Sequence, residues 1–236
     1  MKTLLSLFLA LTLSYGNAKA QTLKNIFNSI TKNQGNNNSS NIADGLKEAL
    51  QVGTDRSVQK LSVIDGFFAN AAIKILMPPE ATKVEQKLRA LGFGKQVDNA
   101  ILSMNRAAED AAKSAAPVFI NAIKQMTIQD AVGILRGNDF AATDYLKSKT
   151  LTALTAAFRP IIESSLEKVN ATKYWNSIFS TYNKFSLNKV NPDLSAYVTE
   201  RALNGIFYQV ALEEQQIRKN PAARTTELLK QVFGSK

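Results

Sequence analysis

Six polar side chains in the middle of the chain have types and spacings that could form a binding or catalytic site. They are Asn105, Arg106, Glu109, Thr143, Asp144 and Arg159. Two carboxylates facing each other in a cleft can hydrolyse a glycosidic bond, and an arginine beside them can orient an acidic group of the substrate. The same residues also fit a structural network, in which Glu109 or Asp144 pairs with Arg159. We favour the network, because buried ions need partners whether or not they have a function.

The amino-acid composition excludes most other kinds of catalytic and metal-binding site. The chain has no histidine and no cysteine, so it lacks the commonest general base, thiolate nucleophiles and the usual zinc ligands. The segment around Asp139 lacks the alternating oxygen ligands and final glutamate of a calcium-binding EF-hand loop. Gly92-Phe93-Gly94 lacks the third glycine of a dinucleotide cradle. We therefore expect no metal and no cofactor, and we lean towards a protein that is not an enzyme.

Helices are expected to position these side chains, because apolar residues recur at the α-helical period almost throughout 42–236. Gly92–Gly94 separates two helices, Thr127–Asp130 has the spacing of a capping box, and Pro160 is expected to kink or end a long helix. No segment alternates as a β-strand does. The predicted fold class is all-α, a multi-helix bundle with one domain.

Burial is also predicted for particular helix faces. The helix after Pro79 is expected to turn Val84, Leu88 and Leu91 towards the core. Glu214 and Arg218 lie four residues apart in the longest helix, and we expect them to form an ion pair on the surface.

Two aromatic segments stand out between and within these helices. The connection 65–79 contains Phe67, Phe68 and Met77 and is unusually apolar for a loop. We expect it to fold over the core, with a lid or a partner contact through these three residues as the alternative. Five aromatic residues lie within 174–185, four of them near one helical face, and core packing explains them better than a stacking surface for sugars or bases.

The N-terminal segment predicts export. Residues 1–20 have the form of a signal peptide, with the apolar run Leu4–Leu13 and the peptidase signature Ala18-Lys19-Ala20. Residues 21–30 predict a short amphipathic leader helix, and the Asn- and Ser-rich residues 31–41 predict a flexible linker. A lipid anchor would need a cysteine after the cleavage site, and no later apolar run is long enough to span a bilayer. We expect a soluble mature protein without a lipid anchor, in the periplasm, at the cell surface or outside the cell.

The charge is basic, with 29 Lys and Arg against 19 Asp and Glu, a formal net charge of +10. Such a surface is attracted to anionic lipids, acidic glycans or nucleic acid. The basic residues are nevertheless spread along the chain without a run of five or six, which favours general solubility over a dedicated anion site. We expect no specific binding of nucleic acid, and an anionic surface stays open as a partner.

Several short strings, in this order and spacing, resemble a family of exported bacterial proteins known as domain of unknown function four-one-nine-seven. The strings are Leu46-Lys47-Glu48-Ala49-Leu50 with Gly53-Thr54, Ser103-Met104-Asn105-Arg106-Ala107-Ala108-Glu109, Ala141-Ala142-Thr143-Asp144-Tyr145, Ala157-Phe158-Arg159-Pro160 and Thr172-Lys173-Tyr174. The resemblance covers most of 42–233. It implies an all-helical exported domain with no assigned activity, so it supplies no catalytic residues.

These observations together predict a non-enzymatic helical domain that binds another envelope protein or a ligand, through a groove or through its apolar loop. The alternative is a carboxylate-based hydrolase or lyase that acts on cell-wall or extracellular glycans. In that alternative Glu109 and Asp144 are the acids and Arg159 orients the substrate.

Overall fold

The computed structural model describes residues 37–168, 170–185, 189, 193–224, 230 and 233. The predicted signal peptide, the leader helix and residues 31–36 of the predicted linker lie outside these residues. The chain divides between Asn41 and Ile42 into two compact units, of which the second, 42–236, is described below.

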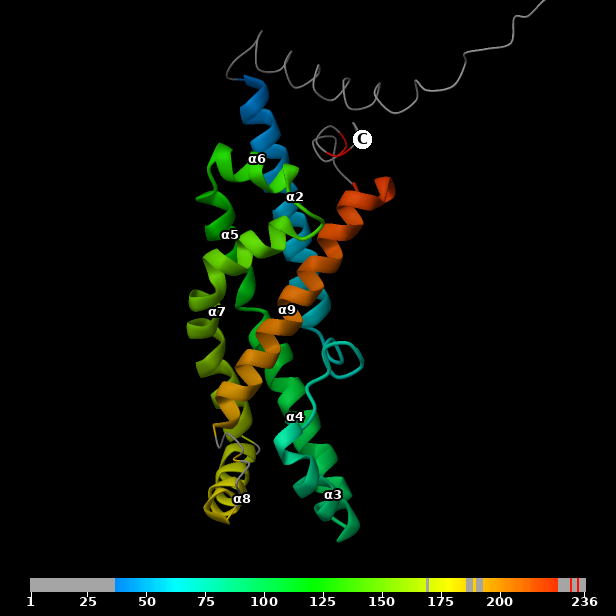
Figure 1. The fold of residues 1–236 in the computed structure, drawn as a ribbon, viewed down its shortest axis with the longest axis vertical. Coiled ribbons are helices and arrows are strands. Elements are labelled where there is room, and N and C mark those ends of the chain that lie inside the picture. The colour runs from blue at the N-terminus through cyan, green and yellow to red at the C-terminus, as the bar shows by residue number, and fades with distance from the viewer. Residues whose placement is uncertain are drawn as a thin grey trace, which may run out of the picture. The chain divides into compact units, whose positions relative to one another are not determined.

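Helices form most of the described chain, and none of the described residues is in a β-strand, so the predicted all-α fold class is confirmed. Their order is α2 (Asn37–Leu61), η1 (Pro79–Ala81), α3 (Thr82–Ala90), α4 (Gly94–Ala112), α5 (Ala115–Lys124), α6 (Ile128–Arg136), α7 (Ala141–Glu167), α8 (Ala171–Phe185), α9 (Leu194–Lys219) and η2 (Pro221–Ala223), where η marks a 3-10 turn (Figure 1). Over the described residues, no helix has the length and apolar content needed to cross a membrane.

The start of α2 corrects one prediction. Residues 37–41, expected to belong to the flexible linker, are helical, because α2 begins at Asn37. Asparagine and serine are only mediocre helix formers, but intrinsic propensity is a weak preference, and residues 37–41 continue directly into the longer helix α2.

Local signals set several helix ends. At the start of α6 the Thr127 hydroxyl accepts a hydrogen bond from the Asp130 N–H (3.1 Å), and the Asp130 carboxylate accepts one from the Thr127 N–H (2.9 Å), so the predicted capping box is confirmed. Hydrogen bonds from the hydroxyl and then the backbone of Thr127 lower the pKa of Asp130. After α3 the chain turns at Gly92, whose φ of 87° favours glycine. Pro160 does not end α7, which continues to Glu167.

The core lies where α7 packs against α9 and α4. Along α7, side chains at helical spacing are buried on the inner face: Ala142, Leu146, Leu154, Phe158, Ile162 and Leu166. The facing side of α4 is rich in alanine, including Ala107, Ala108 and Ala111, none of which is exposed to solvent. Small side chains let the two helix backbones approach closely and still exclude water.

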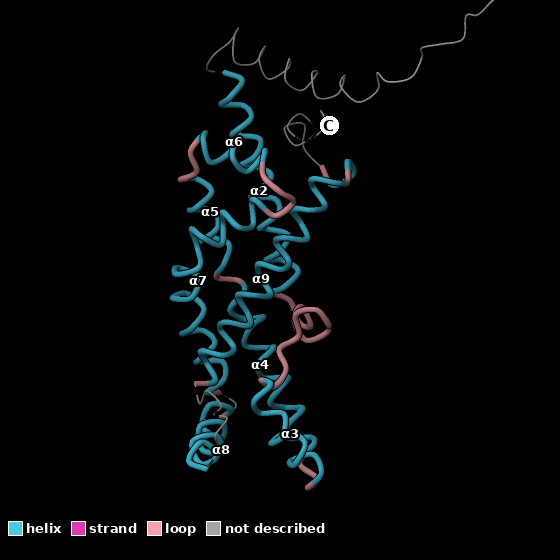
Figure 2. The backbone as a smooth tube through the Cα atoms, viewed as in Figure 1, coloured by secondary structure: helices cyan, strands magenta, loops and turns pink. Residues whose placement is uncertain are grey.

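The segment 62–78 connects α2 to η1 as turns and extended chain (Figure 2). Phe67 and Ile75 are completely buried, and Ile73 is 6% exposed. This segment therefore folds over the core, as the sequence predicted.

Phe67 packs onto α9 at Gly205. A β-carbon added at Gly205 would lie 2.5 Å from Cε1 of the Phe67 ring, whereas one added at Gly133 in α6 would meet nothing within 4 Å. Since Phe67 is enclosed by the core, its ring cannot move without repacking.

Gly205→Ala is therefore expected to lower the free energy of unfolding by about 1–3 kcal/mol, because overpacking outweighs the gain in helix propensity. The matched control Gly133→Ala should raise it by roughly 0.5–1 kcal/mol, because only the helix preference changes. Urea unfolding followed by circular dichroism measures both. Equal effects of the two substitutions would contradict the proposed contact.

The helix α3 is less buried than the sequence predicted. None of its nine residues, all of them described, is fully buried: Val84 and Leu88 are half-buried, and Leu91 just beyond its end is 71% exposed. In α8, by contrast, Trp175 and Phe179 are 5% and 3% exposed, which confirms core packing for these two aromatic residues. The side chains of the other aromatic residues of 174–185 lie outside the described part.

Candidate functional site

The six predicted site residues do not converge on one place. They fall into three separate groups: Asn105, Arg106 and Glu109 on α4, Thr143 and Asp144 at the start of α7, and Arg159 further along α7. Each group is described in turn, because each has a different role in the structure.

The α4 group holds the loop 62–78 in place. Asn105 is fully buried; its carboxamide oxygen accepts from the Ile75 N–H (2.8 Å), and its NH₂ donates to the carbonyls of Ile75 and Ile101 (both 2.8 Å). One Glu109 oxygen accepts from the N–H groups of Phe67 and Phe68, each at 3.1 Å. These contacts satisfy backbone groups that a folded-over loop would otherwise bury without partners.

Arg106 completes this group. It donates to the second Glu109 oxygen (2.6 Å) and to Asp65 (2.7 Å), and these hydrogen bonds, the one with Glu109 first, raise its pKa. Asp65 has a φ of 70°, an uncommon backbone conformation for a residue other than glycine. Both oxygens of Glu109 are thus engaged in holding the loop, which leaves this carboxylate poorly placed to act as a catalytic acid.

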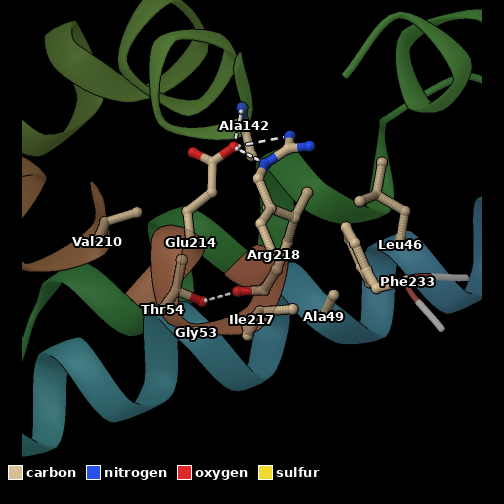
Figure 3. Close-up of a pocket in the computed structure, with 11 residues that line it drawn as sticks. Leu46, Ala49, Gly53, Thr54, Ala142, Val210, Glu214, Ile217, Arg218 and Phe233 are labelled. Atoms are coloured by element: carbon tan, nitrogen blue, oxygen red, sulfur yellow. Dashed lines mark hydrogen bonds and ion pairs between the residues drawn. The ribbon is translucent and has the colours of Figure 1, made fainter. Parts of the chain in front are cut away.

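The second group is a buried network around Glu214 and Arg218 of α9 (Figure 3). The Glu214 carboxylate accepts from the N–H groups of Ala142 (3.0 Å) and Thr143 (2.8 Å) and from the Thr143 hydroxyl (2.8 Å). Arg218 donates to Glu214 (2.9 Å) and to the carbonyl of Ile134 near the end of α6 (2.9 Å). The network therefore joins the end of α6, the start of α7 and α9.

This network corrects the prediction that Glu214 and Arg218 form a surface pair. Their exposed fractions are 8% and 7%. The i, i+4 spacing was predicted correctly, but α6 and α7 cover that face of α9, and their unpaired helix-end groups supply further hydrogen bonds. The side chain of Arg224 adds to this buried set by donating to the carbonyls of Ile217 and Arg218 (both 3.0 Å).

Arg159 and Asp144 take no part in either group. Arg159 pairs with Asp193 at 2.6 Å, and both are partly exposed, so the predicted pairing of Arg159 with Glu109 or Asp144 is wrong. Burial opposes the charge of Asp193, but hydrogen bonds from the Ala196 N–H and from Arg159 outweigh it and lower its pKa. The Asp144 side chain is exposed to solvent.

The distance between Glu109 and Asp144 follows from a contact near the far end of α7. Ser165 of α7 donates to Asp110 (3.1 Å), the residue next to Glu109. Asp144 precedes Ser165 by 21 positions in the same helix, which corresponds to roughly 30 Å along its axis. A pair of catalytic carboxylates needs a separation of about 5–10 Å. Within the described residues, no group of three or more acidic residues is placed to hold a metal ion either.

The three residues predicted to contact a partner, Phe67, Phe68 and Met77, also lie in different environments. Phe67 is completely buried and therefore not accessible to a partner. Phe68 is half-buried, with the Lys74 ammonium 3.8 Å from the centre of its ring. Met77 is half-buried and lines a groove that the sequence did not predict.

Residues of α3 and α4 line this groove on one side and residues of α8 on the other. The α3–α4 pair and α8 form two separate arms of the bundle (Figure 1). The groove has a volume of about 700 Å³, within the range of about 300–1,000 Å³ typical of small-molecule sites. Its lining is largely apolar: Met77, Ala81, Val84, Leu88, Phe93, Val97, Ala100, Leu102, Met104, Ala171, Trp175, Phe179 and Leu194, with Glu85, Gln96, Asn99 and Ser103 as the polar members. The cavity beside Glu214 and Arg218 measures only about 20 Å³, room for about one water molecule.

The groove exists because α3 packs on α4 while α8 packs on α7 and α9. Val84 and Leu88 therefore pack against the core only in part and also line the space between the arms. On the opposite side the rings of Trp175 and Phe179 lie 4.3 Å apart between centroids, tilted by 46°. The sequence signal for this site was the apolar face of α3, which we expected to be buried by the chain itself.

An ion-pair trio borders the groove on the α3–α4 side. Arg89 donates to Glu85 (2.9 Å) and to Asp98 (2.8 Å), and the hydrogen bonds with Asp98 and then Glu85 raise the pKa of Arg89. The trio of one cation and two carboxylates carries a net charge of −1. Its members are partly exposed, so we expect it to fix α3 on α4 only weakly.

The fold and the groove define an all-helical domain with an open, largely apolar groove among its described residues. The chain belongs to the family described as "Protein of unknown function (DUF4197)", whose model matches residues 36–234, so the predicted resemblance is confirmed. No curated protein and no solved structure matches the chain.

Proposed function

We propose that this chain is a non-enzymatic binding domain that takes a small apolar molecule into the groove between the α3–α4 pair and α8. The observation that carries the proposal is α3, an amphipathic helix whose apolar residues Val84 and Leu88 line the groove without becoming fully buried. When a ligand covers exposed apolar surface in a concave site, that surface is removed from water, and this makes binding favourable.

Two further features support this function. The groove has the volume of a small-molecule site, and clefts between helices of a bundle are common places for such sites. The polar groups that the sequence suggested for catalysis are engaged elsewhere, Glu109 with the loop and Arg159 with Asp193. The binding interpretation therefore uses a large groove with a mostly apolar lining.

Filling the groove tests this function. We expect the uncharged fluorophore N-phenyl-1-naphthylamine to bind the protein saturably, with a rise in fluorescence. Ala100 is a half-buried lining residue of α4, and Ala100→Phe should raise the Kd of the fluorophore by roughly tenfold or more, which corresponds to about 1.4 kcal/mol of lost contact.

The matched control is Ala153→Phe, which adds the same ring at an exposed position of α7 outside the groove. It should leave the Kd unchanged. Absence of saturable binding, or an equal Kd for the two variants, would overturn the proposed function.

We further propose that the protein works outside the cytoplasm, in the bacterial envelope or beyond it. The support is the signal-peptide pattern of residues 1–20, with its apolar run and small residues before Gln21. Expression of the full chain in a bacterium should yield a mature protein that begins at Gln21, as measured by intact mass after cell fractionation. Recovery of the uncut chain from the cytoplasm would contradict this localisation.

A further inference from the structure

We infer that the groove selects uncharged amphiphiles, meaning molecules with an apolar body and with hydroxyl, ester or amide groups but no formal charge. This inference rests on the proposed function, because it names the class of ligand for the same groove. The evidence for this selectivity is the distribution of polar and charged groups around the lining of the groove.

The polar groups of the lining form a stripe on one wall. Gln96, Asn99 and Ser103 follow one another at i, i+3 and i+7 along α4, so they share the helix face that lines the groove. Seven residues of helix correspond to roughly 10 Å. A ligand lying in the groove can therefore meet several polar groups along one of its edges.

These side chains are neutral, and each can both donate and accept a hydrogen bond. The Ser103 hydroxyl donates to the backbone carbonyl of Asn99 at 2.8 Å, which leaves its oxygen free to accept. Amide and hydroxyl groups match hydroxyl, ester and amide groups of a ligand without requiring a charge on either side. A hydrogen bond of this kind avoids the cost of burying an unpaired polar group.

Charge at the groove disfavours an anionic ligand. Among the lining residues that the structure describes, Glu85 is the only one with a formal charge. It belongs to the trio with Arg89 and Asp98, whose net charge is −1, and Arg89 is already held by both carboxylates. Lys83 and Lys87 of α3 are exposed and do not line the groove. An anionic headgroup would therefore meet a negative charge and lose its hydration without gaining a cation there.

The opposite wall accommodates the apolar body. The tilted ring pair of Trp175 and Phe179 lines this wall with a small exposed area, and Val84 and Leu88 line the groove from α3. A cationic ligand would gain only the single carboxylate of Glu85, which is already paired with Arg89. The groove thus contrasts with the chain as a whole, whose formal net charge of +10 would by itself favour anions.

Displacement of bound N-phenyl-1-naphthylamine from the full chain tests the selectivity. The competitors are 1-oleoylglycerol, oleate and oleylamine, which share one hydrocarbon chain and differ in charge, each used below the concentration at which it aggregates. We expect 1-oleoylglycerol to displace the fluorophore at a concentration roughly tenfold lower than either charged competitor needs. A tenfold difference corresponds to about 1.4 kcal/mol, the order of the cost of burying one polar or charged group without a partner.

Two charge variants sharpen the test. Asn99→Lys places a cation in the polar stripe and should improve displacement by oleate about tenfold, while displacement by 1-oleoylglycerol changes by less than about twofold. Glu85→Gln should change oleate binding in the same direction. The matched control Asn204→Lys adds the same charge at an exposed position of α9 and should change neither competitor, because salt screens charges outside the groove.

The outcomes separate this inference from the proposed function. If the fluorophore binds but oleate or oleylamine displaces it as well as 1-oleoylglycerol does, the selectivity is wrong and the binding function stands. The selectivity is equally wrong if none of the three competitors displaces the fluorophore. If the fluorophore itself does not bind, the proposed function fails first. An equal gain for oleate in Asn99→Lys and Asn204→Lys would show general electrostatic attraction instead of recognition in the groove.

Discussion

Replacing Glu214 by alanine is expected to lower the free energy of unfolding by about 3–5 kcal/mol, because it leaves the buried charge of Arg218 without its partner. The substitution also removes the acceptor for the N–H groups of Ala142 and Thr143 at the start of α7. α7 has no side-chain cap of its own, since its N-cap residue is Phe140. Glu214 therefore acts as the cap of α7 from another helix.

Thermal unfolding followed by circular dichroism measures this effect, and the Tm should fall by roughly 10 °C or more. Glu214→Gln should have a smaller effect, because an amide oxygen still accepts from the N–H groups of α7 although the ion pair is lost. The control Glu200→Ala removes an exposed carboxylate of the same helix and should change the Tm little. If Glu214→Ala and Glu200→Ala were equally stable, the network would not stabilise the fold.

Asn105→Leu is expected to have the second-largest effect, a loss of about 2–5 kcal/mol in the free energy of unfolding. Leucine has the same branched shape and number of side-chain heavy atoms as asparagine, but it leaves the N–H and the carbonyl of Ile75 buried without the partners that Asn105 provides. Because Ile75 lies in the loop 62–78, the loss should first appear as loosening of this segment.

Hydrogen–deuterium exchange checks that location. The amides of 66–76 should lose protection in Asn105→Leu before those of α7, and the denaturation midpoint should fall. Asn204→Leu makes the same chemical change at an exposed position of α9 and should have little effect on either measurement. Uniform loss of protection throughout the core, with the loop no more affected than α7, would show that Asn105 does not act through this segment.

The sites around Glu214 and Asn105 show that the role of residues with a given sequence spacing depends on their tertiary contacts. Asn105 and Glu109 share a helix face, as their spacing predicted, yet their side chains hold the loop 62–78 in place. The spacing of residues within one helix predicts which side chains are neighbours. Which other element covers these side chains depends on how the helices pack. Asp144 is the clearest case, because its place in α7 separates it from Glu109 by most of the length of the helix.

The loop 62–78 and the groove show, for apolar residues, the same difference between what the sequence predicts and what packing decides. The apolar content of 65–79 predicted a segment over the core, and the burial of Phe67 and Ile75 confirms it. The apolar face of α3 predicted burial as well, but α3 and α8 stand on separate arms, so Val84 and Leu88 line a groove. Hydrophobic periodicity identifies the face that water disfavours and does not identify what covers it.

The sequence by itself determined the helical class, the capping box of α6, the break between two helices at Gly92–Gly94, and the absence of histidine and cysteine chemistry, because these depend on residue type and local spacing. Only the tertiary structure decided that Glu214 and Arg218 are buried, that Arg159 pairs with Asp193, and that an apolar groove lies between two arms. These features depend on contacts between residues far apart in the chain, which the crossing and separation of the helices set.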